Sequence, residues 1–178
     1  VYINASSPRM LEAAGQVADG AYAMVGVHPD VLDRTRDHLR AGARRTGRTL
    51  VDLPVAYGVP IYMGATRAEA LEGMRAYAFS NIAKPRKVFA TVMRELYPSL
   101  RVPDAADDLA MPDLVTIADA LGIVGTPHEC GERFAAFAKA SGVDHIVCRI
   151  FYAGADAMVA LAALVTDVLP TTAARAAR

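Results

Sequence analysis

The sequence predicts an α/β fold with parallel strands, because short apolar runs alternate with amphipathic helical segments along the chain. Three strand-then-helix units follow one another before residue 84, and a further helix and strand come after residue 122. Alternation of this kind joins parallel strands through right-handed crossovers. With 178 residues, the chain is long enough for one domain with a full core.

The first unit is a short apolar strand that runs from Val1 into the turn Ser6-Ser7-Pro8, followed by a helix over residues 8–18. Ser7 suits the helix cap, and Pro8 suits the first helical position. The unpaired amides and the positive dipole end of such a helix favour an anion. Many turns of this kind bind nothing, so the turn alone leaves both interpretations open.

The next two units repeat this pattern. A strand at 21–25 leads through Gly26 and His28-Pro29-Asp30 into a charged amphipathic helix. The apolar run at 53–63 is typical of a strand that is covered on both faces. Thr66 and Glu69 then have the spacing of a capping box, which predicts the start of another helix.

The rhythm changes between residues 84 and 122. Helical segments at 85–96 and 112–121 flank a Pro- and Asp-bearing loop at 97–111, which is longer than a usual connection between such units. An excursion of this length covers a binding site or forms a subunit contact, and the sequence does not separate these two.

The pattern resumes at Thr126, with Pro127 at the first helical position and Glu129 closing a second capping box. A fourth strand is predicted at 143–150. A last helix at about 153–169 ends before Pro170, and we expect the tail at 171–178 to be disordered.

Composition limits the partners. The 19 basic and 19 acidic residues balance, which argues against a nucleic-acid or anionic-membrane surface. Cys130 and Cys148 have no metal-ligand or disulfide-framework spacing, so we predict no metal site and reduced thiols in the cytoplasm. The run at 153–169 is too short and too polar for a membrane span, and no secretory signal is evident. The chain starts in mid-strand, so we expect residues to precede Val1.

Several blocks together resemble the bacterial luciferase-like family of flavin and deazaflavin oxidoreductases. They occur in family order and at about family spacing, over essentially the whole chain. They are Val1-Tyr2-Ile3-Asn4-Ala5-Ser6-Ser7-Pro8-Arg9-Met10 with Ala18-Asp19-Gly20, then Gly125-Thr126-Pro127-His128-Glu129-Cys130, Gly142-Val143-Asp144-His145 and Val168-Leu169-Pro170.

The resemblance implies the C-terminal half of a (β/α)8 TIM barrel. The four predicted strands become barrel strands five to eight, and about 84–122 becomes a helical insertion after the third of them. The half-barrel spans 1–170, and 171–178 is its tail. Such a half has open sheet edges and an exposed apolar face. We therefore expect a missing N-terminal half, a second chain or a homo-oligomer to complete it.

Barrel enzymes place their sites at the C-terminal ends of the strands. By the resemblance, backbone amides of Ala5, Ser6 and Ser7 hold the phosphate of a flavin-type cofactor, and the serine hydroxyls add hydrogen bonds. Val25 and Gly26 lie near the cofactor ring or its side chain.

Arg149 is predicted at the C-terminal end of the last strand. It binds an acidic substrate or the cofactor tail, or else forms an ion pair with a neighbouring helix. His28 is either a proton donor or a turn residue. Four tyrosines are candidates for the barrel interior, where aromatic walls suit a flat ring, although core packing also explains them: Tyr22, Tyr57, Tyr62 and Tyr152.

No paired-carboxylate, Ser-His-Asp or Cys-His arrangement supports hydrolysis, and no catalytic residue is identified. In the family that the chain resembles, the cofactor supplies the redox chemistry. We therefore predict an oxidoreductase that uses coenzyme F420, a deazaflavin, for hydride transfer to or from a small organic substrate. An FMN-dependent monooxygenase is the alternative, and a non-catalytic flavin-binding or structural half-barrel is the alternative of another class.

Overall fold

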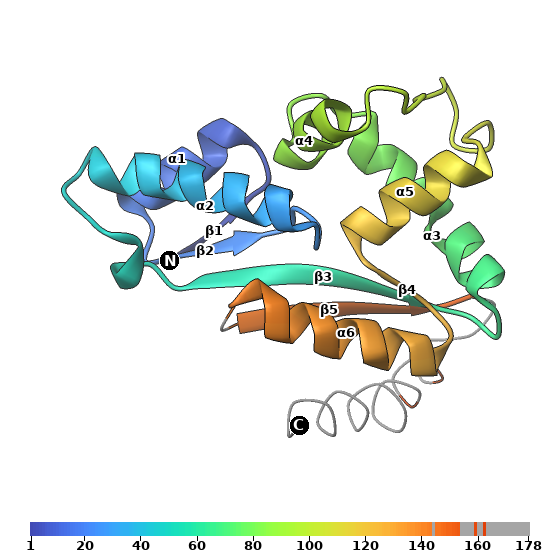
Figure 1. Ribbon diagram of the computed structural model, residues 1–178. Coiled ribbons are helices and arrows are strands. Elements are labelled where there is room, and N and C mark those ends of the chain that lie inside the picture. The colour runs from blue at the N-terminus through green and yellow to red at the C-terminus, as the bar shows by residue number, and fades with distance from the viewer. Residues whose placement is uncertain (144, 154–158, 160–161, 163–178) are drawn as a thin grey trace.

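The computed structural model describes residues 1–143, 145–153, 159 and 162, which form a parallel sheet with helices packed against it (Figure 1). The predicted last helix and the tail at 171–178 fall almost entirely outside these residues. The strands are β1 (Tyr2–Ala5), β2 (Gly20–Ala23), β3 (Val55–Met63), β4 (Ile123–Gly125) and β5 (His145–Tyr152). The helices are α1 (Pro8–Val17), α2 (Pro29–Arg44), α3 (Arg67–Ile82), α4 (Val88–Leu96), α5 (Met111–Leu121) and α6 (Pro127–Ser141), with a 3₁₀ turn at Leu50–Asp52.

The long strand β3 organises the sheet. Strand β5 pairs with β3 along nearly the whole length of β3, from Ala56 to Met63. Its other edge is shared, because β2 pairs with the start of β3 and β4 pairs with its end. The order β1-β2-β3-β5 agrees with the prediction of consecutive parallel barrel strands. The prediction of four strands missed β4, since three residues are too few for a periodic pattern.

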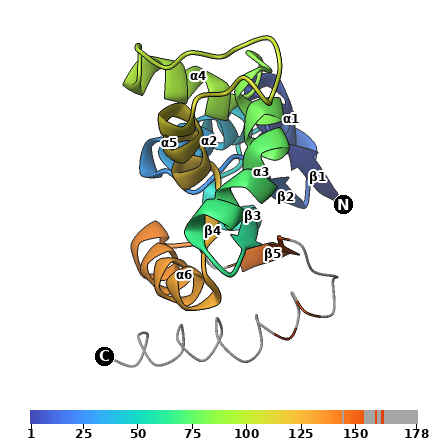
Figure 2. The same ribbon diagram turned by 90° about the vertical axis from the view of Figure 1, so that its right-hand side faces the viewer.

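The sheet has one face covered by helices and one inner face. Tyr22 and Gly58 share the inner face, since a Cβ on Gly58 would lie 2.6 Å from the Tyr22 hydroxyl. By alternation along paired strands, Tyr62 and Arg149 point to that same side. The opposite face of β3 and β5 packs against α6, which lies on one side of these strands in Figure 2.

Helices α1 and α2 cross in close contact through glycines. A Cβ on Gly15 would lie 2.8 Å from the Ala43 amide nitrogen and even nearer to the Leu39 carbonyl oxygen. A Cβ on Gly42 would collide with the backbone of Glu12. These glycines let the two helix backbones approach, and this packing holds α1 behind the strands that it connects.

Helix caps follow the predicted local chemistry with one exception. Both predicted capping boxes are present, at Thr66 with Glu69 and at Thr126 with Glu129. Pro8 begins α1 as predicted, and Ser7 is the N-cap residue, but its side chain makes no capping hydrogen bond. The Ser7 hydroxyl and the amides of the first turn of α1 are therefore not bonded to each other.

The segment between α3 and β4 contains two helices, α4 and α5, close to the predicted ranges 85–96 and 112–121. In both ribbon views α4 lies at the opposite end of the molecule from α6 (Figures 1 and 2). Among the described residues, no helix is long and apolar enough to cross a membrane.

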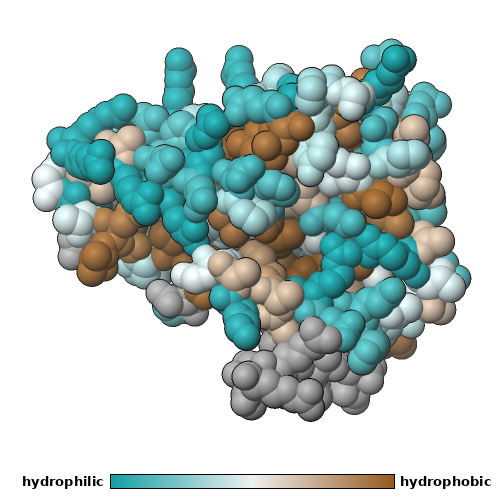
Figure 3. Space-filling model, in the orientation of Figure 1, coloured by the Kyte–Doolittle hydropathy of each residue, from teal (hydrophilic) through white to brown (hydrophobic). Residues whose placement is uncertain are grey.

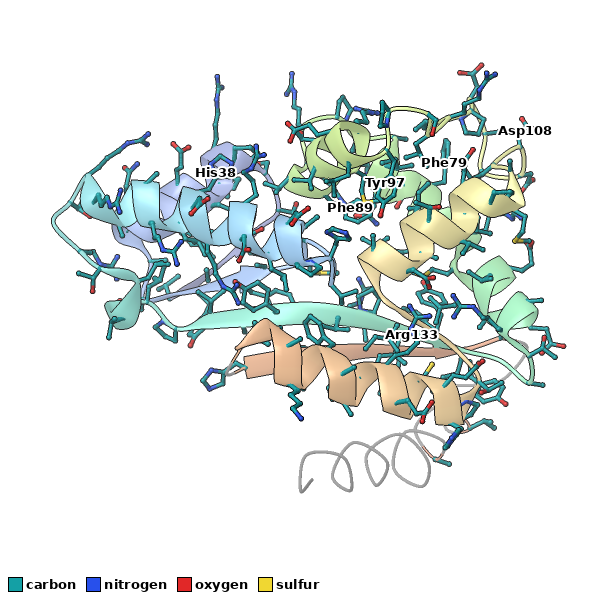
Figure 4. All side chains as sticks on the ribbon, viewed as in Figure 1. His38, Phe79, Phe89, Tyr97, Asp108 and Arg133 are labelled. Carbon is teal, nitrogen blue, oxygen red and sulfur yellow. The ribbon has the colours of Figure 1, made fainter. Side chains whose placement is uncertain are left out.

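The carboxylate of Asp119 holds the C-terminal end of this segment, at the end of α5, against two other helices. Asp119 on α5 accepts hydrogen bonds from Arg67 on α3 at 2.7 and 2.9 Å and from Arg133 on α6 at 2.8 Å. Arg67 also donates to the Val124 carbonyl of β4 at 2.6 Å. Figure 4 shows Arg133 between α6 and the end of α5. Three helices and one strand thus meet at one carboxylate.

Replacing Gly15 with alanine should destabilise the fold by about 1–3 kcal/mol, because the new methyl group meets backbone atoms of α2 that cannot move independently. The free energy of unfolding in urea measures this effect. The matched control is Gly73→Ala on α3, where a Cβ would make ordinary contacts with two side chains, Ala153 at 3.5 Å and Tyr62 at 3.8 Å. That change should be neutral or stabilising by up to about 1 kcal/mol. Equal stability of the two variants would contradict the tight α1–α2 contact.

Burial raises the pKa of the Cys130 thiol to about 12, so roughly one thiol in 10⁴ is ionised at pH 8. The folded state therefore holds this proton, and its stability should fall as pH rises above the thiol's unfolded pKa. In a Cys148→Ser variant, alkylation by iodoacetamide at pH 8 should require unfolding by urea. Labelling of the folded protein as fast as of the unfolded protein would contradict the buried position.

Candidate functional site

The predicted phosphate turn lies where β1 ends. Ala5 is buried and pairs with Ala23 of β2, so the backbone turns at Ser6 directly beside the end of β2. Ser6 and Ser7 are both partly exposed. The structure thus brings Ala5, Ser6 and Ser7 together at the C-terminal edge of the sheet, with the first turn of α1 immediately after them.

The first turn of α1 keeps its donors available to a ligand. Ser7 has an extended backbone, with φ −117° and ψ 154°, and its side chain accepts no hydrogen bond from the helix. Pro8 carries no amide hydrogen, so the donors of this turn belong to the next residues, Arg9 and Met10, which are exposed. This turn contains no acidic residue that would repel an anion.

The segment after α3 lies against this turn. The Val88 amide, at the start of α4, donates to the Ser6 carbonyl at 3.0 Å. Lys87 is the N-cap residue of α4 and its ammonium group donates to the Asn81 side-chain oxygen. Burial, together with the charge of Lys84, lowers the pKa of Lys87. A partly buried lysine therefore stands next to the candidate phosphate turn.

Val25 and Gly26 lie in a different environment. The Val25 side chain is 1% exposed and belongs to the hydrophobic core. Gly26 has a φ of +105°, and Phe89 and the Ala120 carbonyl oxygen close the space beside it (Figure 4). The prediction that these two residues lie near the cofactor ring stays a prediction.

Arg149 lies on the inner face of β5 beside aromatic rings. Its guanidinium carbon is 5.8 Å from the Tyr77 ring centroid and 5.7 Å from that of Phe151. Tyr62 stacks on Phe151 at 4.4 Å with 17° between the ring planes. Among the described residues, Arg149 forms no ion pair with a helix carboxylate, so cation–π contacts take the place of that predicted alternative.

A polar path connects Arg149 to Lys87 along α3. Tyr77 and Asn81 lie four residues apart, on one side of that helix. The Asn81 side-chain amide donates to the Tyr77 carbonyl at 2.9 Å, and its oxygen accepts from Lys87. Burial raises the pKa of the Tyr77 hydroxyl, and the nearby Arg149 opposes this shift. The path brings two cations and a phenol to one side of the structure.

The sequence missed Tyr77, Asn81 and Lys87 as parts of this region. The available signal was Asn81, a carboxamide that is 2% exposed and sits four residues after a tyrosine on an otherwise mostly apolar helix. A buried amide of this kind needs hydrogen-bond partners. The partners are close in sequence, the Tyr77 carbonyl and the Lys87 ammonium, but the contact of this segment with the Ser6 turn is made through tertiary packing that the sequence pattern does not show.

The other candidates divide between the two faces. Tyr22 and Tyr62 lie on the inner face, as predicted for the barrel interior. Tyr57 and Tyr152 alternate to the helix-covered face, so a place in the barrel interior is wrong for these two and the alternative of core packing holds. His28 caps α2, its ring nitrogen accepting from the Asp30 amide at 3.3 Å, which agrees with its interpretation as a turn residue.

A hollow of about 360 Å³ lies elsewhere, between α2 and α6 on the helix-covered side. Its walls are mainly apolar, with Leu32 and Phe137 from the two helices, and hydrophobic residues show between hydrophilic ones on this face in Figure 3. The hollow does not include the Ser6-Ser7 turn or Arg149. In the part of the chain that the structure describes, no group of three or more His, Cys, Asp or Glu residues forms a metal site.

Solved structures of similar fold include flavin- and deazaflavin-linked enzymes. The coenzyme F420-dependent tetrahydromethanopterin reductase from Methanopyrus kandleri gives a TM-score of 0.66 at 20% identity, over 95% of this chain and 50% of that chain. An EDTA monooxygenase from Chelativorans sp. BNC1 gives 0.59 at 20% identity, over 98% and 44%. The oxygenating constituent of a Pseudomonas putida 3,6-diketocamphane monooxygenase, in complex with FMN, gives 0.54 at 17% identity, over 96% and 47%.

These likenesses confirm the fold as part of a TIM barrel, and this chain spans about half the length of these structures. The sequence model of the luciferase-like monooxygenase family matches residues 1–145, well over half of the chain. The family resemblance of the sequence blocks is therefore confirmed, and the chain belongs to the luciferase-like monooxygenase family.

Proposed function

We propose that this chain forms the phosphate-binding half of a flavin-type oxidoreductase, with the cofactor phosphate held at the Ser6-Ser7 turn. The observation that carries the proposal is the free helix start at the end of β1, where Ser7 leaves the first-turn amides of α1 without a side-chain partner. The deazaflavin coenzyme F420, transferring hydride to or from a small organic substrate, is the first choice.

The local donor set fits a phosphate group. The amides of the first turn of α1, the partly exposed Ser6 and Ser7 hydroxyls and the nearby Lys87 are all donors. The positive end of the α1 dipole adds to their attraction for an anion. Ala5 contributes through its position, because this small residue ends β1 and aims the backbone into the turn.

The inner face offers a surface for a flat ring or an organic substrate. Tyr77, Phe151 and the exposed Arg149 lie there, while Tyr62 is 8% exposed beneath them. In the proposal, Arg149 binds an acidic group of the substrate or the cofactor tail, since its cation faces rings and not a carboxylate. The bound cofactor would supply the redox chemistry, and these residues would position it and exclude water.

Residues from a second half would complete the pocket. The solved structures named above are about twice as long as the match, and one of them is an enzyme in complex with FMN. We propose that an N-terminal half, or a second chain in a homo-oligomer, covers the exposed inner face. Residues that act directly on substrate then belong to that half or to the inner face of this one.

FMN-dependent monooxygenation is the second candidate. It is favoured by the fold likeness to two monooxygenases, one of them in complex with FMN. Both candidates place a phosphate at the same turn, so the turn alone does not distinguish them. The intact protein is incubated with each cofactor and passed through a gel-filtration column, which removes unbound cofactor. The absorbance that remains with the protein then shows which cofactor binds.

Replacing Ser7 with aspartate should have opposite effects on folding and on binding. Aspartate is a favourable N-cap residue, so stability should be unchanged or higher by up to about 1 kcal/mol. Its charge should repel a phosphate, so the Kd for the cofactor that binds should rise at least about tenfold. Fluorescence titration and thermal unfolding measure the two effects on the same sample.

Ser99→Asp is the matched control, since Ser99 is an exposed loop serine far along the chain from the turn. It adds the same charge and should leave the affinity for the cofactor within about twofold. An unchanged Kd in the Ser7 variant would move the phosphate to another place. Binding of neither coenzyme F420 nor FMN to the intact wild-type protein would overturn the proposed function.

A further inference from the structure

We propose that Lys87, at the start of α4, is a phosphate-binding residue that joins the insertion between β3 and β4 to the β1–α1 turn. The inference deepens the proposed function and rests on it for the identity of the ligand. It adds a side-chain cation from a distant segment to a turn that otherwise offers backbone amides and serine hydroxyls. No sequence motif marked this residue.

The backbone places Lys87 beside the turn. The Val88 amide donates to the Ser6 carbonyl at 3.0 Å, and the Cα of Lys87 belongs to the same peptide unit as that amide. Ser6 is thus in direct contact with the peptide unit that carries Lys87. The flexible four-carbon side chain of lysine allows its ammonium group to reach a ligand at Ser7 by rotation about its own bonds.

The charges around this junction are one-sided. The segment with Ser6 contains no acidic residue before Glu12, and the segment with Lys87 contains none between Glu72 and Glu95. Four basic residues lie within four positions of Ser6 or Val88 along the chain: Arg9, Lys84, Arg86 and Lys87. The junction therefore carries an excess of positive charge within a protein whose basic and acidic residues balance overall.

Lys87 has a neutral partner only. Its ammonium group donates to the Asn81 carboxamide oxygen, and among the described residues it forms no ion pair. Burial and the like charge of Lys84 both disfavour its charged form, which lowers its pKa. A phosphate at the turn would supply the missing negative charge and stabilise the ammonium form. A partly buried cation without a counter-ion, beside free helix amides, is the arrangement that an anion completes.

The first test uses inorganic phosphate and needs no flavin. Phosphate, compared with chloride at equal ionic strength, should raise the Tm of the intact wild-type protein and of Lys87→Arg, which keeps the charge. The increase should be lost in Lys87→Met. Arg86→Met is the matched control, because it removes a neighbouring exposed cation and should keep the increase. An equal increase in Lys87→Met and wild type would overturn the inference.

The second test compares ligands that differ only in the phosphate. Lys87→Met should raise the Kd for FMN about ten- to a hundredfold, the effect of losing a charged hydrogen bond. It should leave the Kd for riboflavin within about twofold. Equal losses for both ligands would overturn the inference, since the side chain would then act on the ring or on folding. Coenzyme F420 and its chromophore without the phosphate-bearing tail form the corresponding pair.

The two tests separate the inference from the proposed function. A phosphate-dependent Tm increase that requires Lys87, in a protein that binds no flavin, would support the anion site and overturn the cofactor assignment. Flavin binding that is indifferent to Lys87 would support the cofactor assignment and overturn the inference. Lys87→Arg should restore both readouts, which a purely structural role of the Asn81 contact would not require.

Discussion

The fold depends on β3, which among the described strands is the one that pairs with three others. Its nine residues exceed the length of β2, so one edge holds β2 at the start and β4 at the end, while β5 follows the other edge. All residues from Tyr57 to Met63 are buried. Strand β3 therefore positions the inner face, the core against α6 and β4, the strand at which the chain returns from the insertion.

Two contacts then place the insertion relative to the sheet. Asp119 gathers Arg67 and Arg133 near β4, and the Ser6 carbonyl accepts the first amide of α4 at the other end. Between these points α3 presents Tyr77 and Asn81 along the path from β5 to the β1–α1 turn. Helix α3 and the start of the excursion, at Lys87 and Val88, thus join the separate parts of the candidate site. This favours the interpretation that the excursion covers a binding site.

Local chemistry explains which parts of this structure were predictable from sequence. Capping boxes at Thr66 and Thr126 and the proline at α1 depend on residues within one turn, so their positions follow from the sequence alone. The family blocks supplied the barrel topology, which periodicity does not determine. The face of Tyr57 could not be predicted because β3 is buried on both sides and shows no alternation in its sequence. The face of Tyr152 depends on its register opposite Met63, which the sequence does not show. The segment that carries Asn81 and Lys87 reaches Ser6 only through tertiary packing, by way of the Val88 amide, and the sequence of either segment alone does not predict this contact.

The hydrogen bond between the Val88 amide and the Ser6 carbonyl has a consequence for how sequences of this fold could vary. Because both groups belong to the backbone, the hydrogen bond does not depend on the side chain at position 87. Proline at position 88 would remove its donor. Evolution, or a protein engineer, can therefore exchange the charge beside the turn while its position stays constant. A single residue in the insertion would then adjust preference among ligands of different charge, with the barrel framework left untouched.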